Sequence, residues 1–114
     1  MDEVKIYHNP HCSKSREALA LITARGIEPS IVNYLETPPS RLELRKILSS
    51  LGLKASDIVR SKEKLYDELE LASATEDELI QALSEHPSLI QRPIVMAANK
   101  AVLGRPPQNI QQLF

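Results

Sequence analysis

A strand, a helix and a second strand follow one another closely at the start of the chain, and this order constrains the fold more than any other feature. Residues 4–7 alternate apolar and polar side chains and include β-branched residues, which predicts a short strand. Apolar side chains recur at helical spacing over residues 13–25, and Gly26 follows where a left-handed helix cap is favoured. Residues 30–35 are again strand-like. The order predicts a βαβ unit with a right-handed crossover.

Helical patterns fill the middle of the chain, over residues 40–86. Two helices are expected to begin with a capping box and to end at a helix breaker: Ser40 with Glu43 up to Gly52, and Thr75 with Glu78 up to Pro87. One or two further short helices are expected between them, carrying the apolar residues Ile58, Val59, Leu65 and Leu69.

Strand patterns return in the last third. Residues 93–96 and 101–103 predict an antiparallel hairpin with its turn at Asn99 and Lys100. Two prolines at 106 and 107 then predict a short final helix that buries Ile110, Leu113 and Phe114. We therefore expect one α/β domain over residues 1–114, with the order β-α-β, helical insert at about 40–86, β-β-α.

Composition excludes several classes of protein. The 114 residues contain one cysteine, which rules out an intrachain disulfide and zinc sites with two or more thiolates. Fourteen Lys and Arg against fifteen Asp and Glu argue against nucleic-acid binding through bulk charge. No apolar run approaches the ~20 residues that cross a bilayer, and the first residues do not resemble a secretory signal. We expect a cytoplasmic protein whose thiol stays reduced.

The single cysteine, Cys12, is a candidate nucleophile. It falls at the carboxyl end of the first expected strand and at the first turn of the helix, where open α/β sheets place their ligands. Unsatisfied N–H groups there favour thiolate over thiol and offer donors to an oxyanion. Its polar, proline-containing loop argues against the alternative of an inert buried thiol.

Neighbouring side chains refine this hypothesis. His8 and Arg16 flank Cys12 at minus four and plus four, and each positive charge would favour the thiolate. Neither His11 nor His86 is assigned a role in the chemistry, and the three histidines with one cysteine give no metal-site spacing.

The residues that follow Cys12 narrow the chemistry. Ser15 occupies the plus-three position, where a dithiol enzyme has its resolving cysteine, so any redox turnover needs thiols from other molecules. Ala18 stands where the phosphatase pattern Cys-x5-Arg requires arginine. Phosphate-monoester chemistry of that kind is therefore disfavoured.

Three other arginines are candidates for oxyanion binding. Arg92 and Arg105 stand at the ends of the expected hairpin strands, next to prolines that fix the backbone, and Arg60 ends a short helix. A guanidinium group suits an oxyanion because it binds two oxygens at once. Most single arginines are solvated surface groups, so only their convergence would carry this interpretation.

The motifs together closely resemble the glutaredoxin-coupled arsenate reductase family over essentially the whole chain. The matching segments are Tyr7-His8-Asn9-Pro10-x-Cys12-x-x-Ser15-Arg16, Tyr34-Leu35-Glu36-x-Pro38-Pro39-Ser40-Arg41, Arg60, His86-Pro87, Arg92-Pro93-Ile94-Val95 and Gly104-Arg105-Pro106. The resemblance identifies a short-chain member, since longer members continue past the equivalent of Phe114.

The resemblance implies a fold, a reaction and roles for these residues. The fold is thioredoxin-like, with a helical insertion after the second strand and Pro93 as the cis proline that faces the cysteine. Cys12 would attack arsenate, Arg60, Arg92, Arg105 and Arg16 would bind the oxyanion, and His8 would help to keep Cys12 ionised. Glutathione would be a co-substrate and glutaredoxin the partner, with no bound cofactor. Apart from the resemblance, no metal is expected, and the chain is expected to be a monomer because no long apolar face remains unassigned.

Two other functions remain open at this point. One is a glutathione-dependent thiol reductase that uses Cys12 without arsenate and does not need the arginines. The other is a redox-responsive transcription regulator, against which Ser15 counts because such proteins carry a Cys-x-x-Cys switch.

Overall fold

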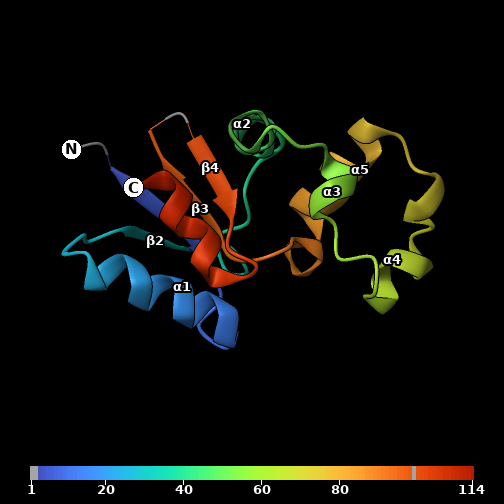
Figure 1. Ribbon diagram of the computed structural model, residues 1–114. Helices are drawn as coiled ribbons and strands as arrows, with labels where there is room; N and C mark the ends of the chain where they lie inside the picture. The colour runs from blue at the N-terminus through green and yellow to red at the C-terminus, as the bar shows by residue number, and fades with distance from the viewer. Residues whose placement is uncertain (1–2, 99) are drawn as a thin grey trace. The chain divides into compact units, whose positions relative to one another are not determined.

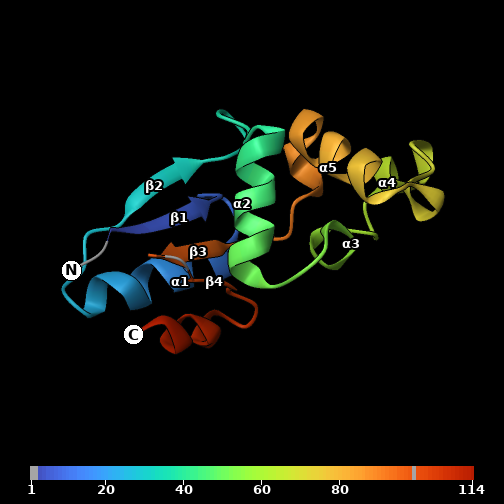
Figure 2. The same ribbon diagram turned by 90° about the horizontal axis from the view of Figure 1, so that it is seen from above.

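The first strand lies inside a mixed sheet. The computed structural model describes residues 3–98 and 100–114, and within them four strands form one sheet in the order β2-β1-β3-β4 (Figure 1). β1 and β2 run parallel, whereas β3 runs antiparallel to both β1 and β4 (Figure 2). The strands are β1 (Val4–His8), β2 (Ser30–Asn33), β3 (Ile94–Ala97) and β4 (Lys100–Leu103).

One face of the sheet is covered by the helix α1 (Ser13–Ala24) and by the 3₁₀ segment η3 (Pro107–Leu113), which pack against each other (Figures 1 and 2). Alternate residues of a strand point to the same face, so β1 sends Val4 and Ile6 into this layer. The buried cluster there consists of Val4, Ile6, Ala18, Ile22, Val95 and Ile110.

The predicted βαβ unit is confirmed, with one boundary shifted. β2 ends at Asn33 and not at residue 35. The N–H groups of Glu36 and Thr37 both donate to the Asn33 carbonyl oxygen, so the chain turns directly after the strand. The α/β class expected from the sequence is therefore the observed one.

The last third also follows the predicted order, with two differences. β4 already begins at Lys100, while Asn99, the other residue of the expected turn, lies outside the described residues. The final helix is 3₁₀ in form and buries Ile110, but Phe114 is 40% exposed, so the prediction that it is buried is wrong. The Arg25 guanidinium carbon lies 5.2 Å from the centroid of the Phe114 ring, which holds the ring at the surface.

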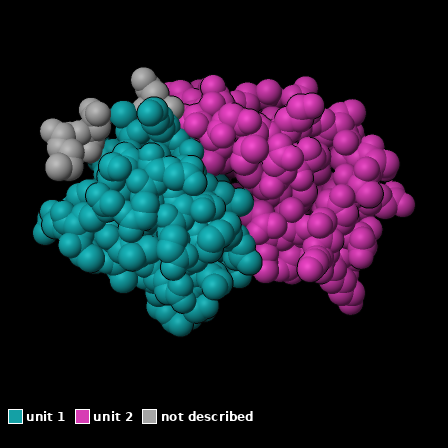
Figure 3. Space-filling model, viewed as in Figure 1, with its two compact units in different colours: residues 1–37, 92–114 teal, residues 38–91 magenta. Residues whose placement is uncertain are grey.

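Contacts divide the chain into two compact units (Figure 3). The first comprises residues 1–37 and 92–114 and contains the sheet, and the second comprises residues 38–91, close to the insert expected at about 40–86. The helices of the second unit are α2 (Arg41–Leu51), α3 (Ala55–Ile58), α4 (Lys64–Glu68), the 3₁₀ turn η1 (Leu71–Ser73), α5 (Glu76–Glu85) and the 3₁₀ turn η2 (Pro87–Leu89).

Helix caps in the second unit form where the sequence predicts them. Ser40 Oγ accepts a hydrogen bond from the Glu43 N–H, and Thr75 and Glu78 form a reciprocal capping box. Gly52 closes α2 in the left-handed conformation, at φ 70°. The caps satisfy N–H groups and carbonyls that would otherwise lack partners at the helix ends.

The apolar faces of these helices form a core within the second unit. Helix α5 contacts α2, α3 and η2, and Val59 forms an isolated antiparallel bridge with Ile90. The fully buried apolar side chains of this unit include Leu44, Ile47, Ile58, Leu83 and Leu89.

No helix in residues 3–98 and 100–114 is both long enough and apolar enough to cross a membrane.

We expect Ile22→Ala to destabilise the protein far more than Ile31→Ala. Ile22 is fully buried between α1 and the sheet, whereas Ile31 on the edge strand β2 is 55% exposed. The buried substitution leaves a cavity and should cost about 2–5 kcal/mol, and the exposed one less than about 1 kcal/mol. Chemical denaturation followed by circular dichroism measures both, and equal losses would contradict the assigned core.

Candidate active site

Cys12 lies where β1 turns into α1. It is the N-cap residue of α1, with extended backbone angles, and its carbonyl oxygen accepts a hydrogen bond from the Arg16 N–H at 3.0 Å. Its own N–H donates to the Asn9 carbonyl oxygen, also at 3.0 Å, which closes the loop between strand and helix. The thiol therefore sits at the positive end of a twelve-residue helix.

The surroundings of Cys12 favour its thiolate. Burial raises the pKa of the Cys12 thiol, but a hydrogen bond from the Ser15 N–H lowers it, as do a hydrogen bond and the charge of Arg92 and the Lys14 N–H. The lowering causes together outweigh burial, so the pKa lies below the usual value for cysteine. Because the thiolate is the nucleophilic form, this arrangement activates Cys12.

Arg92 reaches Cys12 from the neighbouring strand. It precedes β3, whose Ile94 pairs with Tyr7 of β1, and this antiparallel register brings residue 92 to the carboxyl end of β1. Its Nε is buried and has no hydrogen-bond partner among the described residues. A guanidinium group beside a thiolate, with a donor still unsatisfied, is suited to hold an anion at the sulfur.

The backbone beside Arg92 is held by a close contact with β4. The Arg92–Pro93 peptide bond is cis, the form that the sequence resemblance implies. The Gly104 N–H donates to the Pro93 carbonyl oxygen at 2.8 Å, and a Cβ added at Gly104 would lie 2.8 Å from Pro93 Cγ. Only glycine fits at position 104 without moving this proline.

His8 is hydrogen-bonded to Ser15 at the start of α1, and its surroundings lower the pKa of its ring. Its Nδ1 lies 2.6 Å from Ser15 Oγ, and Ser15 is fully buried. Burial lowers the pKa of His8, and the positive charge of Arg16 lowers it further. A neutral ring supplies no positive charge to the thiolate, so any contribution of His8 at neutral pH has to be made through its hydrogen bond.

The remaining predicted arginines occupy different positions. Arg105 is exposed and donates from Nη1 to the Arg92 carbonyl oxygen at 3.3 Å, so these two residues are brought together. Arg16 donates to the Pro10 carbonyl oxygen at 3.2 Å and braces the loop that contains Cys12. Arg60 belongs to the second unit, where it forms an ion pair of 2.8 Å with Glu63.

Sequence reasoning did not assign Ser15, Asn9 or Asn33 to the site as partners. The Asn9 N–H donates to Ser15 Oγ at 3.0 Å, and Asn9 Oδ1 accepts from the His11 N–H at 2.9 Å. Asn33 is the register partner of His8, and its Oδ1 is buried without a partner among the described residues. Asn33, which directly follows the apolar pair Ile31-Val32, offered such a signal, whereas Ser15 lies between Lys14 and Arg16 and offered none.

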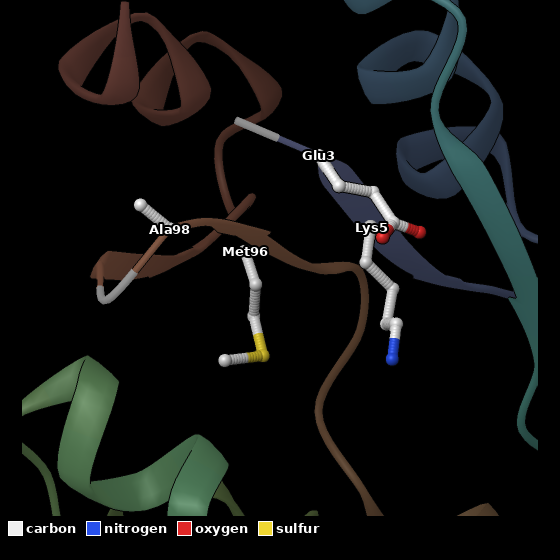
Figure 4. Close-up of a pocket in the computed structure, with 4 residues that line it drawn as sticks. All are labelled: Glu3, Lys5, Met96 and Ala98. Carbon is white, nitrogen blue, oxygen red and sulfur yellow. The ribbon is translucent and has the colours of Figure 1, made fainter. Parts of the chain in front are cut away.

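A separate cavity of about 280 Å³ lies away from Cys12 (Figure 4). Its lining includes Lys5 and Met96, which are paired across β1 and β3 and point to the same side of the sheet, together with Glu3 and Ala98. None of the residues assigned to the site lines it. In the part of the chain that the structure describes, no three His, Cys, Asp or Glu side chains are grouped to hold a metal.

An activated thiolate on a βαβ turn, with a cis proline opening the adjacent antiparallel strand, is the arrangement of thiol-dependent proteins of thioredoxin-like fold. The chain belongs to the ArsC family, whose model matches residues 7–113.

Two proteins named arsenate reductase match this chain along its whole length. The chain is 49% identical to "Arsenate reductase" from Neisseria meningitidis serogroup A, covering 100% of both chains. It is 44% identical to "Arsenate reductase" from Escherichia coli, covering 100% of this chain and 82% of that one.

Solved structures show the same fold. The structure titled "Arsenate reductase from Vibrio cholerae" superposes with a TM-score of 0.96 at 46% identity, covering 99% of this chain and 98% of the other. "Putative arsenate reductase from Yersinia pestis" gives 0.93 at 50% identity, covering 96% and 99%. The thioredoxin-like α/β fold and the family expected from the sequence are confirmed.

Replacing Arg92 by methionine should raise the pKa of Cys12 by about one unit, because the thiolate loses a hydrogen bond and an adjacent positive charge. The pH dependence of alkylation by iodoacetamide measures this pKa, since Cys12 is the only cysteine. Arg25→Met removes the same charge at the far end of α1, roughly 18 Å away and beyond the ~10 Å screening length, and should leave the profile unchanged. Equal shifts in both variants would contradict a specific role for Arg92.

Gly104→Ala should destabilise the protein by about 1–3 kcal/mol, because the new methyl group would meet Pro93 Cγ at 2.8 Å. It should also slow alkylation of Cys12, since Pro93 follows the arginine that faces the thiolate. Thermal unfolding and the alkylation rate report the two effects. Ala101→Gly, which only removes a methyl group from β4, is the comparison for alkylation, and a wild-type rate in Gly104→Ala would refute the link.

Proposed function

We propose that this protein reduces arsenate to arsenite through a covalent adduct on Cys12, with glutathione and glutaredoxin supplying the electrons. The observation that carries the proposal is the Arg92 guanidinium beside the Cys12 thiolate, with Nε buried and unsatisfied. A bound oxyanion would supply hydrogen-bond acceptors to the Arg92 guanidinium directly beside the nucleophilic sulfur of Cys12. The names of the relatives support arsenate as the oxyanion.

Arginine has two tasks in this reaction. Arg92 and Arg105 are linked through the Arg92 carbonyl and form the nearer part of the oxyanion site in the first unit. Arg16 is a further oxyanion ligand of the proposal within the first unit, and binding would require exchange of its present partner, the Pro10 carbonyl. Arg60 stays a prediction of the sequence, and its present partner is Glu63. Positive charge lowers the cost of bringing an anion to a thiolate and offsets charge on the adduct.

The proposed reaction balances in atoms and electrons. The Cys12 thiolate attacks arsenic, an S–As bond forms, and one arsenate oxygen leaves as water after protonation. The thiol of glutathione then adds to arsenic and displaces a second oxygen as water. When a glutaredoxin thiolate attacks the glutathione sulfur, a mixed disulfide forms and the electron pair of that S–As bond stays on arsenic, which passes from +5 to +3. Water finally releases arsenite and restores the Cys12 thiol.

The amino-acid sequence explains why the proposed reaction needs thiols from other molecules. The plus-three residue is Ser15, whose hydroxyl cannot form a disulfide, and the sequence holds no other cysteine. Both electrons must therefore come from thiols of other molecules. The low thiol pKa of Cys12 suits it for attack and also for leaving when arsenite is released.

Cys12→Ser should lower arsenate-dependent oxidation of NADPH to the rate of the enzyme-free mixture, in an assay with glutathione, glutaredoxin and glutathione reductase. A serine hydroxyl is not ionised at neutral pH and does not form the S–As bond. Ala20→Ser, which adds a hydroxyl to the exposed side of the same helix, should retain the wild-type rate.

The same assay separates the competing functions. Full turnover by Cys12→Ser would overturn the mechanism. Wild-type protein that oxidises NADPH with a glutathionylated peptide but not with arsenate would show a thiol reductase instead. Replacing glutaredoxin by thioredoxin tests the donor, and faster turnover with thioredoxin would refute the proposed coupling.

A further inference from the structure

Ser15 stands at the position where a dithiol enzyme has its second cysteine, yet its side chain is completely buried. It belongs to the first turn of α1, three residues beyond Cys12, on the buried face of the helix with Ala18 and Ile22. A buried hydroxyl at a helix start is expensive unless its hydrogen bonds are satisfied. The partners of this hydroxyl therefore indicate what it does.

Two hydrogen bonds join Ser15 to the loop before Cys12. Ser15 Oγ accepts from the Asn9 N–H at 3.0 Å and lies 2.6 Å from Nδ1 of His8. With the His8 ring neutral, the arrangement that satisfies both groups has the hydroxyl donating to Nδ1 and the ring proton on Nε2. The opposite tautomer would leave the buried hydroxyl proton without an acceptor.

The same residue faces Cys12 with its backbone. Cys12 is the N-cap residue of α1, so the N–H of Ser15 in the first turn is directed toward the Cys12 side chain, and this N–H lowers the pKa of the thiol. Ser15 thus binds His8 and the Asn9 N–H through its side chain, and it directs its backbone N–H toward the Cys12 thiolate. The direction of that N–H depends on how the first turn of α1 is fixed against β1.

We propose that Ser15 is a positioning residue for Cys12: its hydroxyl clamps His8 and the Asn9 N–H and so keeps the Ser15 N–H aimed at the thiolate. The proposal deepens the proposed function, because it rests on Cys12 being the nucleophile, but it does not depend on the substrate. It gives His8 a role that needs no positive charge, since the neutral ring acts as the acceptor that fixes the hydroxyl.

The test is the pH dependence of Cys12 alkylation in the reduced, full-length protein without arsenate. Ser15→Ala should move the midpoint upward by about half to one pH unit, which is a three- to tenfold loss of alkylation rate at pH values below the wild-type midpoint. Thr23→Ala is the matched control, because it removes a hydroxyl group from the same helix. The Thr23 hydroxyl donates to the Ala20 carbonyl oxygen. Its profile should be that of the wild type.

A second measurement uses the wild-type protein and holds even where Ser15→Ala folds poorly. The ¹⁵N chemical shifts of His8 near neutral pH should show a neutral ring with the proton on Nε2 and Nδ1 accepting a hydrogen bond. A proton on Nδ1, or a Ser15→Ala profile identical to that of the folded wild type, would overturn the proposal. If the wild-type protein fails to reduce arsenate while Ser15→Ala still shifts the midpoint of Cys12 alkylation upward, the proposed function is refuted. The positioning role of Ser15 would then stand.

Discussion

The direct turn from β1 into α1 is the constraint on which the site depends. β1 is held on both sides, parallel to β2 and antiparallel to β3, so its last residue, His8, has a fixed place. The turn is closed by the Cys12 N–H on the Asn9 carbonyl and clamped by Ser15. The cysteine consequently meets the helix N-terminus and Arg92, two residues before β3, at the carboxyl end of β1, and both of these favour its thiolate.

The ionisation of Cys12 depends on two opposing effects, burial of the thiol and hydrogen bonds donated to its sulfur. Burial disfavours the thiolate and neutralises His8, while backbone N–H groups and Arg92 more than restore the anionic form of Cys12. The result is a reactive anion beside a cation that is not fully satisfied. Such a pair would attract and attack an oxyanion, so the proposed binding and the proposed chemistry share the same residues.

Much of the fold was predictable because its signals are local. Gly52 and the Thr75–Glu78 capping box mark helix ends through hydrogen bonds that span only a few residues, and the periodicities of 4–7 and 13–25 specify a buried strand and an amphipathic helix. One failure lies at a contact between distant residues and the other at a short turn. Phe114 is exposed and contacts Arg25, and β2 ends early because the N–H groups of Glu36 and Thr37 both donate to the Asn33 carbonyl oxygen. Neither interaction leaves a trace in local composition.

The sequence by itself determined the α/β order, the single thiol at a helix start, the absence of a second thiol and the family. Those properties depend on residue type and on near neighbours along the chain. Tertiary contacts place Arg92 beside Cys12, require glycine at position 104 against Pro93, bind His8 to Ser15 and lower the pKa of His8. The position of Arg92 arises from strand pairing between residues 87 to 93 positions apart, and the other facts arise from close packing and burial, which no local pattern encodes.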